Sequence, residues 1–536
     1  SLSRRGVGGE VLKQSIGSDE FIVTANAERG SLQIIRNVLM NWLSFAATIV
    51  TGFFMSPFLV RHLGDSHYGV WILLGSLVGY LGLLDFGIHP SIVKRVAEFR
   101  ARGDQEAINR LVTGGLAVFT VLSIVSLALT GALAIFFNDL FHTPVADNTI
   151  AILVLIVGLN FAINLPASVF IGVLRGYQRY DLDAAVTSFV ILSRCVFIIW
   201  FILQGYGLLA LAILTFAFDM ARLVYLIHRV FRINSDIHVA REHLDWQETR
   251  QLLGYSSHFF LITLGTQLNF VTDSIVIGLF LPTASVTLYF IANRLVTYLR
   301  DLVVEMTGVL MPAISDLHAS QDDTRVRELH VISTKYTLLI SLPVAAILLI
   351  MGDTFIALWI GPGYQTSALI LRILTIAIMA HLIGLPTASV LTGLGQHRVI
   401  ARFTIAQALA NLILSLLLVK PFGLRGVAMG TLISMVGFML VTMPVYFRHY
   451  LKLPIGDYLR RSTLLPLAIQ IPLLASLVFL KIYTSPASLL TFFGLVGIAL
   501  IPYGVLAYTT CLSQVEKRAF SRLADKFGLK LAPRFS

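Results

Sequence analysis

Fourteen blocks of apolar residues, most of them about 20 residues long, run through this 536-residue sequence. A helix rises 1.5 Å per residue, so a block of this length crosses the roughly 30 Å hydrocarbon core of a bilayer. Only 13% of the residues are charged, against about 25% in soluble domains. The sequence therefore predicts an all-α polytopic membrane protein. The expected spans are 37–60, 67–88, 111–137, 149–173, 184–203, 205–228, 252–281, 286–314, 334–360, 366–391, 400–419, 424–447, 462–480 and 488–511.

Lys and Arg are distributed unevenly among the connections between these spans. With the N-terminus in the cytoplasm, 32 of the 40 fall on the cytoplasmic side and four on the outer side. Positive residues accumulate on the cytoplasmic side of membrane proteins, so we expect both termini there. The same bias explains the net charge of +11 without a nucleic-acid partner. The remaining four basic residues lie inside spans.

An internal repeat is visible when the first half is shifted by 218 residues, because 58–111 then aligns without gaps. Tyr80 meets Tyr298 and Asp104 meets Asp322. The shift equals six spans, which predicts two six-helix lobes in a parallel repeat, a transporter architecture. The expected divisions are a cytoplasmic tail (1–36), a first lobe (37–228), a cytoplasmic linker (229–251), a second lobe (252–447), two extra helices (448–511) and a basic cytoplasmic tail (512–536).

No catalytic or cofactor motif stands out. Cys195 and Cys511 lie in apolar blocks and read as inert thiols. No Cys/His cluster has metal-site spacing, and phosphate-loop, dinucleotide and hydrolase motifs are absent from the sequence. The outer connections are also too short for an external active site. We therefore expect neither an enzyme nor a cofactor, and no resident metal.

Four intramembrane arginines are the strongest functional signal: Arg194, Arg294, Arg300 and Arg372. An Arg at the bilayer centre costs about 2.5–3.5 kcal/mol on insertion scales, so its presence suggests function. Guanidinium groups bind phosphate bidentately and stay charged. We expect the four to line a cationic cavity that binds a phosphate-bearing substrate. A structural ion pair or snorkelling is the alternative, and it weighs most for Arg372.

A polar stripe lies on the span that carries Arg294. Arg294, Tyr298, Asp301 and Glu305 share one helical face. Such a stripe should face water rather than lipid. Asp301, Glu305 and Asp273 in the preceding span are candidates for ion coupling or for salt bridges within the cavity.

Seven short segments, in order, resemble a known family. They are Phe58–Val70, Leu83–Gly87, Leu174–Asp181, Asp273–Gly278, Leu358–Tyr364, Gly393–Arg398 and Phe422–Ala428. In this order they resemble the polysaccharide-transport flippases of the multidrug/oligosaccharidyl-lipid/polysaccharide exporter superfamily, a group that includes O-antigen flippases.

The resemblance implies that a polyprenyl-diphosphate-linked oligosaccharide is moved from the cytoplasmic to the outer leaflet of the bacterial inner membrane, by alternating access, for lipopolysaccharide or exopolysaccharide synthesis. The expected partners are this lipid-linked sugar and membrane lipids, with a polysaccharide polymerase as a candidate. The alternatives are a peptidoglycan-precursor flippase or a drug/cation antiporter of the same superfamily. A membrane polysaccharide polymerase or ligase would need a long external loop.

Overall fold

The computed structural model describes residues 36–37, 39–307, 310–447, 454–514 and 516–518, and each regular element within these ranges is a helix. The α-helices are α2 (Asp65–Leu81), α3 (Ile88–Arg102), α4 (Gln105–Phe141), α5 (Asp147–Gly176), α6 (Tyr180–Leu203), α7 (Gly207–Ile233), α8 (Trp246–Phe270), α9 (Thr272–Phe280), α10 (Thr283–Thr307), α11 (Leu310–Ala319), α12 (Asp323–Trp359), α13 (Gln365–Gly393), α14 (His397–Phe422), α15 (Leu424–Tyr446), α16 (Ile455–Leu459), α17 (Leu465–Ala468), α18 (Gln470–Tyr483) and α19 (Leu489–Leu506). A further helix, Leu39–Leu63, precedes α2.

Eleven helical segments in the described ranges are long and apolar enough to cross a membrane. One of them, Arg398–Tyr446, contains both α14 and α15, which are separated at Gly423. The all-helical, multi-pass membrane architecture expected from the sequence is therefore confirmed. The helices α8, α9 and α10 are not among the eleven, and α10 carries two arginines, Asp301 and Glu305.

The chain divides into two compact units. Unit 1 comprises the described residues up to Met55 together with Ile88–Thr130 and Leu155–Ser256. Unit 2 comprises Ser56–Gly87, Gly131–Val154 and the described residues from Ser257 onward. Each unit is drawn from several segments, and the lobe boundaries expected from the sequence stay a prediction. The expected tails lie outside the described residues over 1–35 and 519–536.

Unit 1 has an apolar core formed by α3, α4, α5 and α7. Ile92, Leu111 and Leu226 are almost fully buried in it. Gly115 on α4 and Gly172 on α5 both face Ile92, and a Cβ at either would meet its side chain at 3.3 Å or closer. Small residues at such positions let membrane helices approach closely. The packed helices α6 and α7 continue this bundle, and the chain turns between them at Gly205 and Gly207, both with positive φ.

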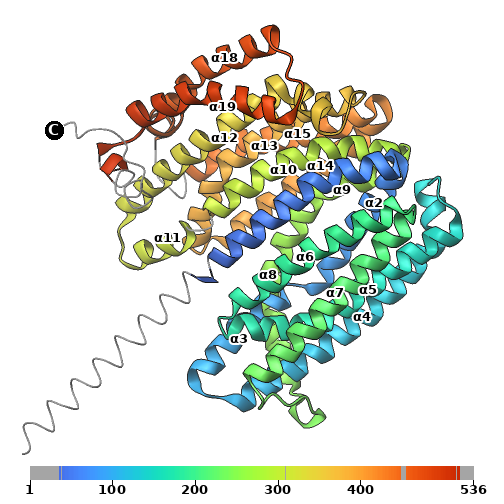
Figure 1. Ribbon diagram of the computed structural model, residues 1–536. Helices are drawn as coiled ribbons and strands as arrows, with labels where there is room; N and C mark the ends of the chain where they lie inside the picture. The colour runs from blue at the N-terminus through green and yellow to red at the C-terminus, as the bar shows by residue number, and fades with distance from the viewer. Residues whose placement is uncertain (1–35, 38, 308–309, 448–453, 515, 519–536) are drawn as a thin grey trace, which may run out of the picture. The chain divides into compact units, whose positions relative to one another are not determined.

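Unit 2 is a bundle in which α10, α13, α14 and α15 pack on one another, with α2 beside α10 and with α12 beside α13 (Figure 1). The last two long helices, α18 and α19, pack against α12. Lys481 on α18 contributes to this docking, because its Nζ donates to the Asp353 carboxylate on α12 at 2.7 Å. The two C-terminal helices are thus attached to the bundle by a charged pair as well as by apolar packing.

A one-residue break separates two helices of unit 2. The helix α8 ends at Phe270 and α9 begins at Thr272, and Val271 between them is a turn residue whose N–H still donates to the Gln267 carbonyl at 2.9 Å. Gln267 on α8 donates to the Gly79 carbonyl at 2.7 Å, and the Tyr80 hydroxyl bonds the Thr272 hydroxyl, so α2 braces both sides of the break. Half-helix ends and the backbone around them bind ions and substrates in transporters. The break places Asp273 in the first turn of α9.

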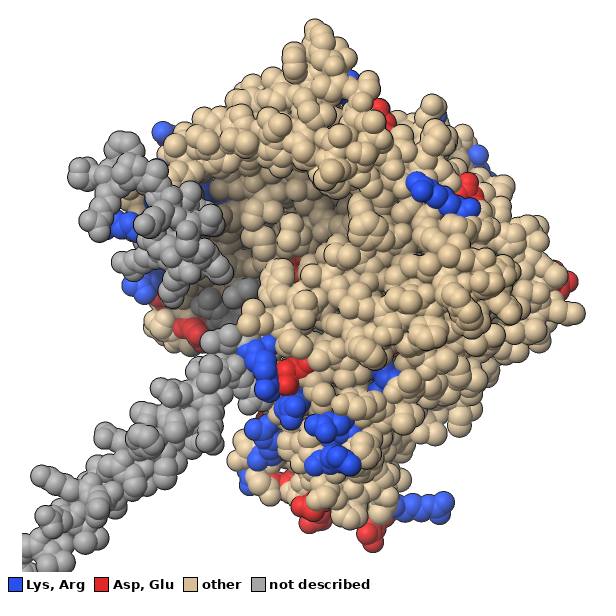
Figure 2. Space-filling model, viewed as in Figure 1, with Lys and Arg blue, Asp and Glu red and all other residues tan. Residues whose placement is uncertain are grey.

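The exposed side chains of the long helices are predominantly apolar. Phe189, Val196 and Trp200 on α6 are 55–70% exposed, and Leu490 and Ile498 on α19 are 84% and 66% exposed. Figure 2 shows broad surface without Lys, Arg, Asp or Glu, and charged side chains gathered in separate patches. Exposed apolar surface on this scale is explained by contact with lipid tails.

Candidate functional site

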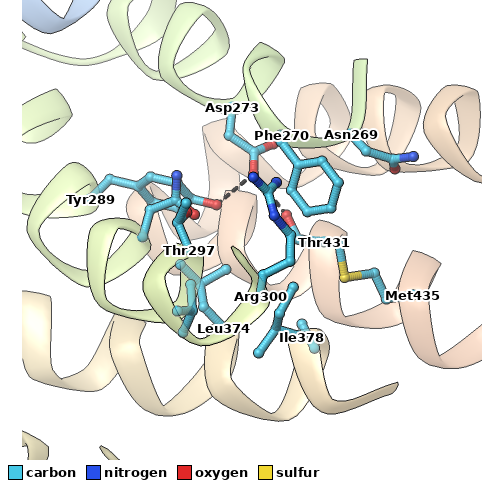
Figure 3. A pocket seen from close by; sticks show the side chains of 13 residues that line it. Asn269, Phe270, Asp273, Tyr289, Thr297, Arg300, Leu374, Ile378, Thr431 and Met435 are labelled. Carbon is cyan, nitrogen blue, oxygen red and sulfur yellow. Dashed lines mark hydrogen bonds between the residues drawn. The ribbon is translucent and has the colours of Figure 1, made fainter. Parts of the chain in front are cut away.

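A pocket in unit 2 lies beside the break between α8 and α9 (Figure 3). Its cavity volume is about 20 Å³, and it is lined by residues of α8, α9, α10, α13 and α15. The polar residues Asp273, Tyr289, Arg300 and Thr431 face it, and Met435 supplies part of its apolar wall. We call it the Asp273 pocket.

Asp273 is the buried carboxylate of this pocket, with 5% of its surface exposed. It accepts hydrogen bonds from Tyr289 Oη at 2.5 Å and from Thr431 Oγ1 at 2.9 Å. Ser415 Oγ lies 3.5 Å from its other oxygen. The three hydroxyls come from α10, α15 and α14, so the carboxylate joins three helices to α9. A carboxylate at this depth is costly without such donors.

Two amide oxygens beside Asp273 have no hydrogen-bond donor in the described part of the chain. Asn269 Oδ1 and Asn411 Oδ1 are both buried and unpaired there. The Asn411 amide nitrogen donates to the Asn269 carbonyl at 3.4 Å, which joins the two residues. A buried, unsatisfied oxygen costs about 1–3 kcal/mol, so a pair of them next to a carboxylate suggests a missing ligand.

The chemistry of these oxygens fits a monovalent cation. The Asp273 carboxylate and the Ser415 and Thr431 hydroxyls are hard oxygen ligands with a single negative charge, and the amide oxygens of the neighbouring Asn269 and Asn411 are of the same kind. The described residues contain no group of three or more His, Cys, Asp and Glu that could hold a metal ion. A divalent ion usually takes more than one carboxylate, whereas Na⁺ is bound by mixed oxygen ligands at broken transporter helices.

Arg300 lines the same pocket but is already paired. Its Nε and Nη2 donate to the Asp301 carboxylate at 3.1 and 2.8 Å. Its guanidinium also lies 4.3 Å from the centre of the Phe270 ring, a cation–π contact. The sequence suggested two roles for Asp301, ion coupling or a salt bridge, and this contact is the salt bridge. Glu305, one turn further along α10, is exposed.

Arg294 differs from the other intramembrane arginines. Its Nε donates to Tyr298 Oη at 3.1 Å, and its guanidinium lies 4.8 Å from the Tyr298 ring centre. Among the described residues no carboxylate lies within 4 Å of it, whereas Arg194, Arg300 and Arg372 each have one. Arg294 therefore keeps an uncompensated positive charge, which is the property an anion site needs.

Arg194 lies in unit 1 and pairs with a residue that the sequence analysis did not select. Its Nη1 lies 3.3 Å from the carboxylate of Asp219 on α7, and each side chain is 25% exposed. Asn160 on α5 donates to the other Asp219 oxygen at 2.9 Å, and Asn164 donates to Asn160. The cluster joins α5, α6 and α7. Asp219 is the single acidic residue of the predicted span 205–228, and this isolated charge was the sequence signal that could have indicated the pair.

Arg372 lies in a second charged cluster of unit 2. It donates to the Leu349 carbonyl at 3.2 Å and to the Asp353 carboxylate at 3.1 Å. Asp353 is shared with Lys481 of α18. This arrangement connects α13 and α18 to α12. A structural ion pair of this kind is the alternative to phosphate binding that the sequence suggested for Arg372.

Residues 58–369, more than half of the chain, match the polysaccharide biosynthesis protein family. The chain belongs to this family. One relative is a protein named "Probable low-salt glycan biosynthesis flippase" from Haloferax volcanii, 23% identical over 475 residues, which cover 87% of this chain and 93% of the relative. The resemblance expected from the seven segments is confirmed.

Solved structures show the same fold. A lipid II flippase in an inward closed conformation superposes with a TM-score of 0.68 at 15% identity, over 91% of this chain and 99% of that one. An inward-facing multidrug resistance transporter of the multidrug and toxin extrusion family gives 0.63 at 14% identity, over 80% and 99%. At these identities the similarity establishes the fold of this family member.

Most of the cluster around Asp273 could not be found from the sequence, which singled out Asp273 alone. Asn269, Tyr289 and Thr431 gave no signal, because an Asn, a Tyr and a Thr in apolar spans are common packing residues. Their part in the site becomes visible only in the fold, which brings residues of several helices together around the Asp273 carboxylate.

Proposed function

We propose that this family member is a flippase that moves a polyprenyl-diphosphate-linked oligosaccharide from the cytoplasmic to the outer leaflet of a bacterial inner membrane, by alternating access, for surface polysaccharide synthesis. The observation that carries the proposal is the uncompensated guanidinium of Arg294 inside the membrane-spanning bundle. Its charge is costly there unless an anion occupies the site during the cycle. A diphosphate is the anion that a lipid-linked sugar brings, and guanidinium binds it bidentately.

The proposed topology has fourteen spans with both termini in the cytoplasm. Counting α14 and α15 separately and adding α8–α9 and α10 to the eleven apolar segments gives fourteen. A parallel repeat is supported by three pairs of helices whose first residues lie 218 positions apart. These are α2 and α10, α4 and α12, and α5 and α13, which begin at Asp65 and Thr283, Gln105 and Asp323, and Asp147 and Gln365.

The proposed driving force is a monovalent cation bound at Asp273. The unpaired oxygens of Asn269 and Asn411 support this role, since they are hard ligands in the neighbourhood of the carboxylate that lack a donor in the described part of the chain. Sodium is the cation we propose, because a proton on the carboxylate would leave the amide oxygens without a ligand. No reaction on the sugar is part of this function, and a polysaccharide polymerase that uses the flipped product is a proposed partner.

The test is the leaflet of the lipid-linked oligosaccharide in cells depleted of the protein. Intact spheroplasts are probed with a sugar-specific lectin that cannot cross the membrane, after complementation with wild type, Arg294→Gln or Arg402→Gln. Arg402 is an exposed arginine of α14 and serves as the matched control. We expect depletion and Arg294→Gln to accumulate an oligosaccharide shielded from the lectin, while Arg402→Gln restores transport.

Other outcomes separate the alternatives. An accumulated intermediate that the lectin reaches would mean that the protein acts after translocation, as a polymerase or ligase would. Accumulation of peptidoglycan precursor instead would assign the substrate to that flippase class. Unchanged lipid intermediates with increased drug sensitivity would assign the protein to the drug/cation antiporters.

A further inference from the structure

A second cavity lies within unit 2, in the halves of α13, α14 and α15 next to the turn between α13 and α14. Its cavity volume is about 100 Å³. Residues 380–388 of α13, 400–407 of α14 and 435–446 of α15 line it. In the proposed topology this end of the helices is cytoplasmic. We call it the inner cavity.

The inner cavity carries polar side chains that the described protein leaves without hydrogen-bond partners. His381, Thr404 and Gln407 line it, and within the described ranges none of their side chains donates to or accepts from another residue. Their side chains are partly accessible rather than fully buried. Polar groups inside a membrane protein must be paired or hydrated, so this lining indicates a water-filled space.

Only a thin partition separates the inner cavity from the Asp273 pocket. Met435 lines both spaces and is 4% exposed. Beside it, the ring of Phe270, which lines the Asp273 pocket, meets the ring of His381, which lines the inner cavity, edge to face at 5.4 Å. Methionine has three rotatable bonds and adapts its shape readily, so a rotamer change at Met435 can join the two spaces.

We propose that the cation at Asp273 exchanges with the cytoplasm through the inner cavity, with Met435 as the gate. The inference rests on the proposed cation site and adds its route. The route runs inside the bundle of α13, α14 and α15. The cation therefore does not pass through the space that the oligosaccharide uses. Cation exchange can then occur while the substrate site is occupied, because the two travel through different spaces.

Side-specific labelling tests whether the inner cavity opens to the cytoplasm. Cys195→Ser and Cys511→Ser first remove both native thiols. Single cysteines are then placed on two walls of the cavity, Thr442→Cys on α15 and Ala388→Cys on α13. Leu440→Cys is the matched control, because Leu440 also lies on α15 but is 64% exposed and does not line the cavity. A membrane-impermeant cationic thiosulfonate should modify the two cavity cysteines in inside-out vesicles and spare Leu440→Cys. If neither cavity cysteine is modified, the proposed route is wrong.

Binding of ²²Na⁺ to the purified full-length protein then tests the route and the site separately. Wild type should bind, and Asp273→Asn should not. Modification of Thr442→Cys should slow ²²Na⁺ association about tenfold, while the treated Leu440→Cys control keeps its rate. Met435→Ala should speed association and dissociation together and leave the equilibrium affinity unchanged, which a packing defect would not do.

The outcomes distinguish the two ideas. No ²²Na⁺ binding to wild type, or equal binding to Asp273→Asn, would reject the cation site itself. Binding that depends on Asp273 but keeps its rate after Thr442→Cys is modified would reject the inner cavity as the route and leave the site standing.

Discussion

The guanidinium of Arg194 lies 3.3 Å from the carboxylate of Asp219, and Asn160 donates to the second oxygen of that carboxylate. The pair joins α6 to α7 within the membrane-spanning part of unit 1. Arg194 was expected from the sequence to bind a diphosphate, and its pairing now provides a second explanation for a buried charge. The two explanations predict different behaviour in a double mutant.

A double-mutant cycle at Arg194 and Asp219 separates them. Arg194→Gln alone should destabilise the protein by about 3–5 kcal/mol, because it leaves Asp219 in the membrane without its cation. Arg194→Gln with Asp219→Asn should recover most of that stability and restore transport, since two neutral amides can pair. Thermal unfolding and lectin accessibility of the lipid-linked sugar provide the two measurements. Recovered stability without recovered transport would return Arg194 to the substrate site.

Asn411 offers a test of the cation site that does not depend on a transport assay. Its Oδ1 is buried without a donor in the described part of the chain. Asn411→Leu removes this unsatisfied oxygen at similar volume, but it also removes the amide that donates to Asn269 and hydrogen-bonds Asp273, so the two effects on stability in sodium-free buffer should largely offset each other. The same change removes a proposed cation ligand. Wild type should gain about 2.7 kcal/mol at a sodium concentration 100 times Kd, and Asn411→Leu should gain far less.

Thermal scans with and without NaCl, with choline chloride at equal ionic strength as the control, measure both effects. A variant that keeps the full sodium shift would show that Asn411 does not bind the ion.

Helix rotation explains which parts of this site the sequence could predict. The spacing of Arg294 and Tyr298 depends on one helix, and their side chains meet as an i,i+4 pair should. The apolar blocks likewise predict spans from local composition alone. Asp273 is different, because Ser415 and Thr431 contact it from 142 and 158 residues away. The break at Val271, which positions it, contains neither Gly nor Pro, so no local signal marks it.

Arg372 should tolerate substitution better than Arg294. Asp353 would keep Lys481 as a partner after Arg372→Gln, with Nζ at 2.7 Å, so no carboxylate is left unpaired. Both Arg372 and Asp353 side chains are also about 40% exposed, and such pairs contribute about 0–1 kcal/mol. We expect near-normal transport for Arg372→Gln in cells where Arg294→Gln fails at equal expression. Equal loss in both variants would restore Arg372 to the phosphate-binding set.

Glu516 should make the docking of the C-terminal segment dependent on pH. Partial burial opposes its ionisation, but hydrogen bonds from the Ser513 backbone, Tyr336 and Lys335 outweigh it and lower the pKa of Glu516 to about 2. A carboxyl whose pKa is lower in the folded state than in the unfolded chain stabilises the fold above the unfolded pKa of about 4.3. That stabilisation is lost as the pH falls from about 4 through 2.

Purified protein with a fluorophore on Gln514→Cys, an exposed position, in the background without native thiols, would report the release of this segment. Wild type should release it progressively between about pH 4 and pH 2, over the range set by the two pKa values. Glu516→Gln should keep a weaker contact with Lys335 that does not change over the same range, because the neutral amide has no charge to lose. Lys94→Gln, which removes an exposed i,i+4 pair with Glu98, should leave the wild-type transition unchanged. An identical transition in Glu516→Gln would mean that another carboxyl controls the docking.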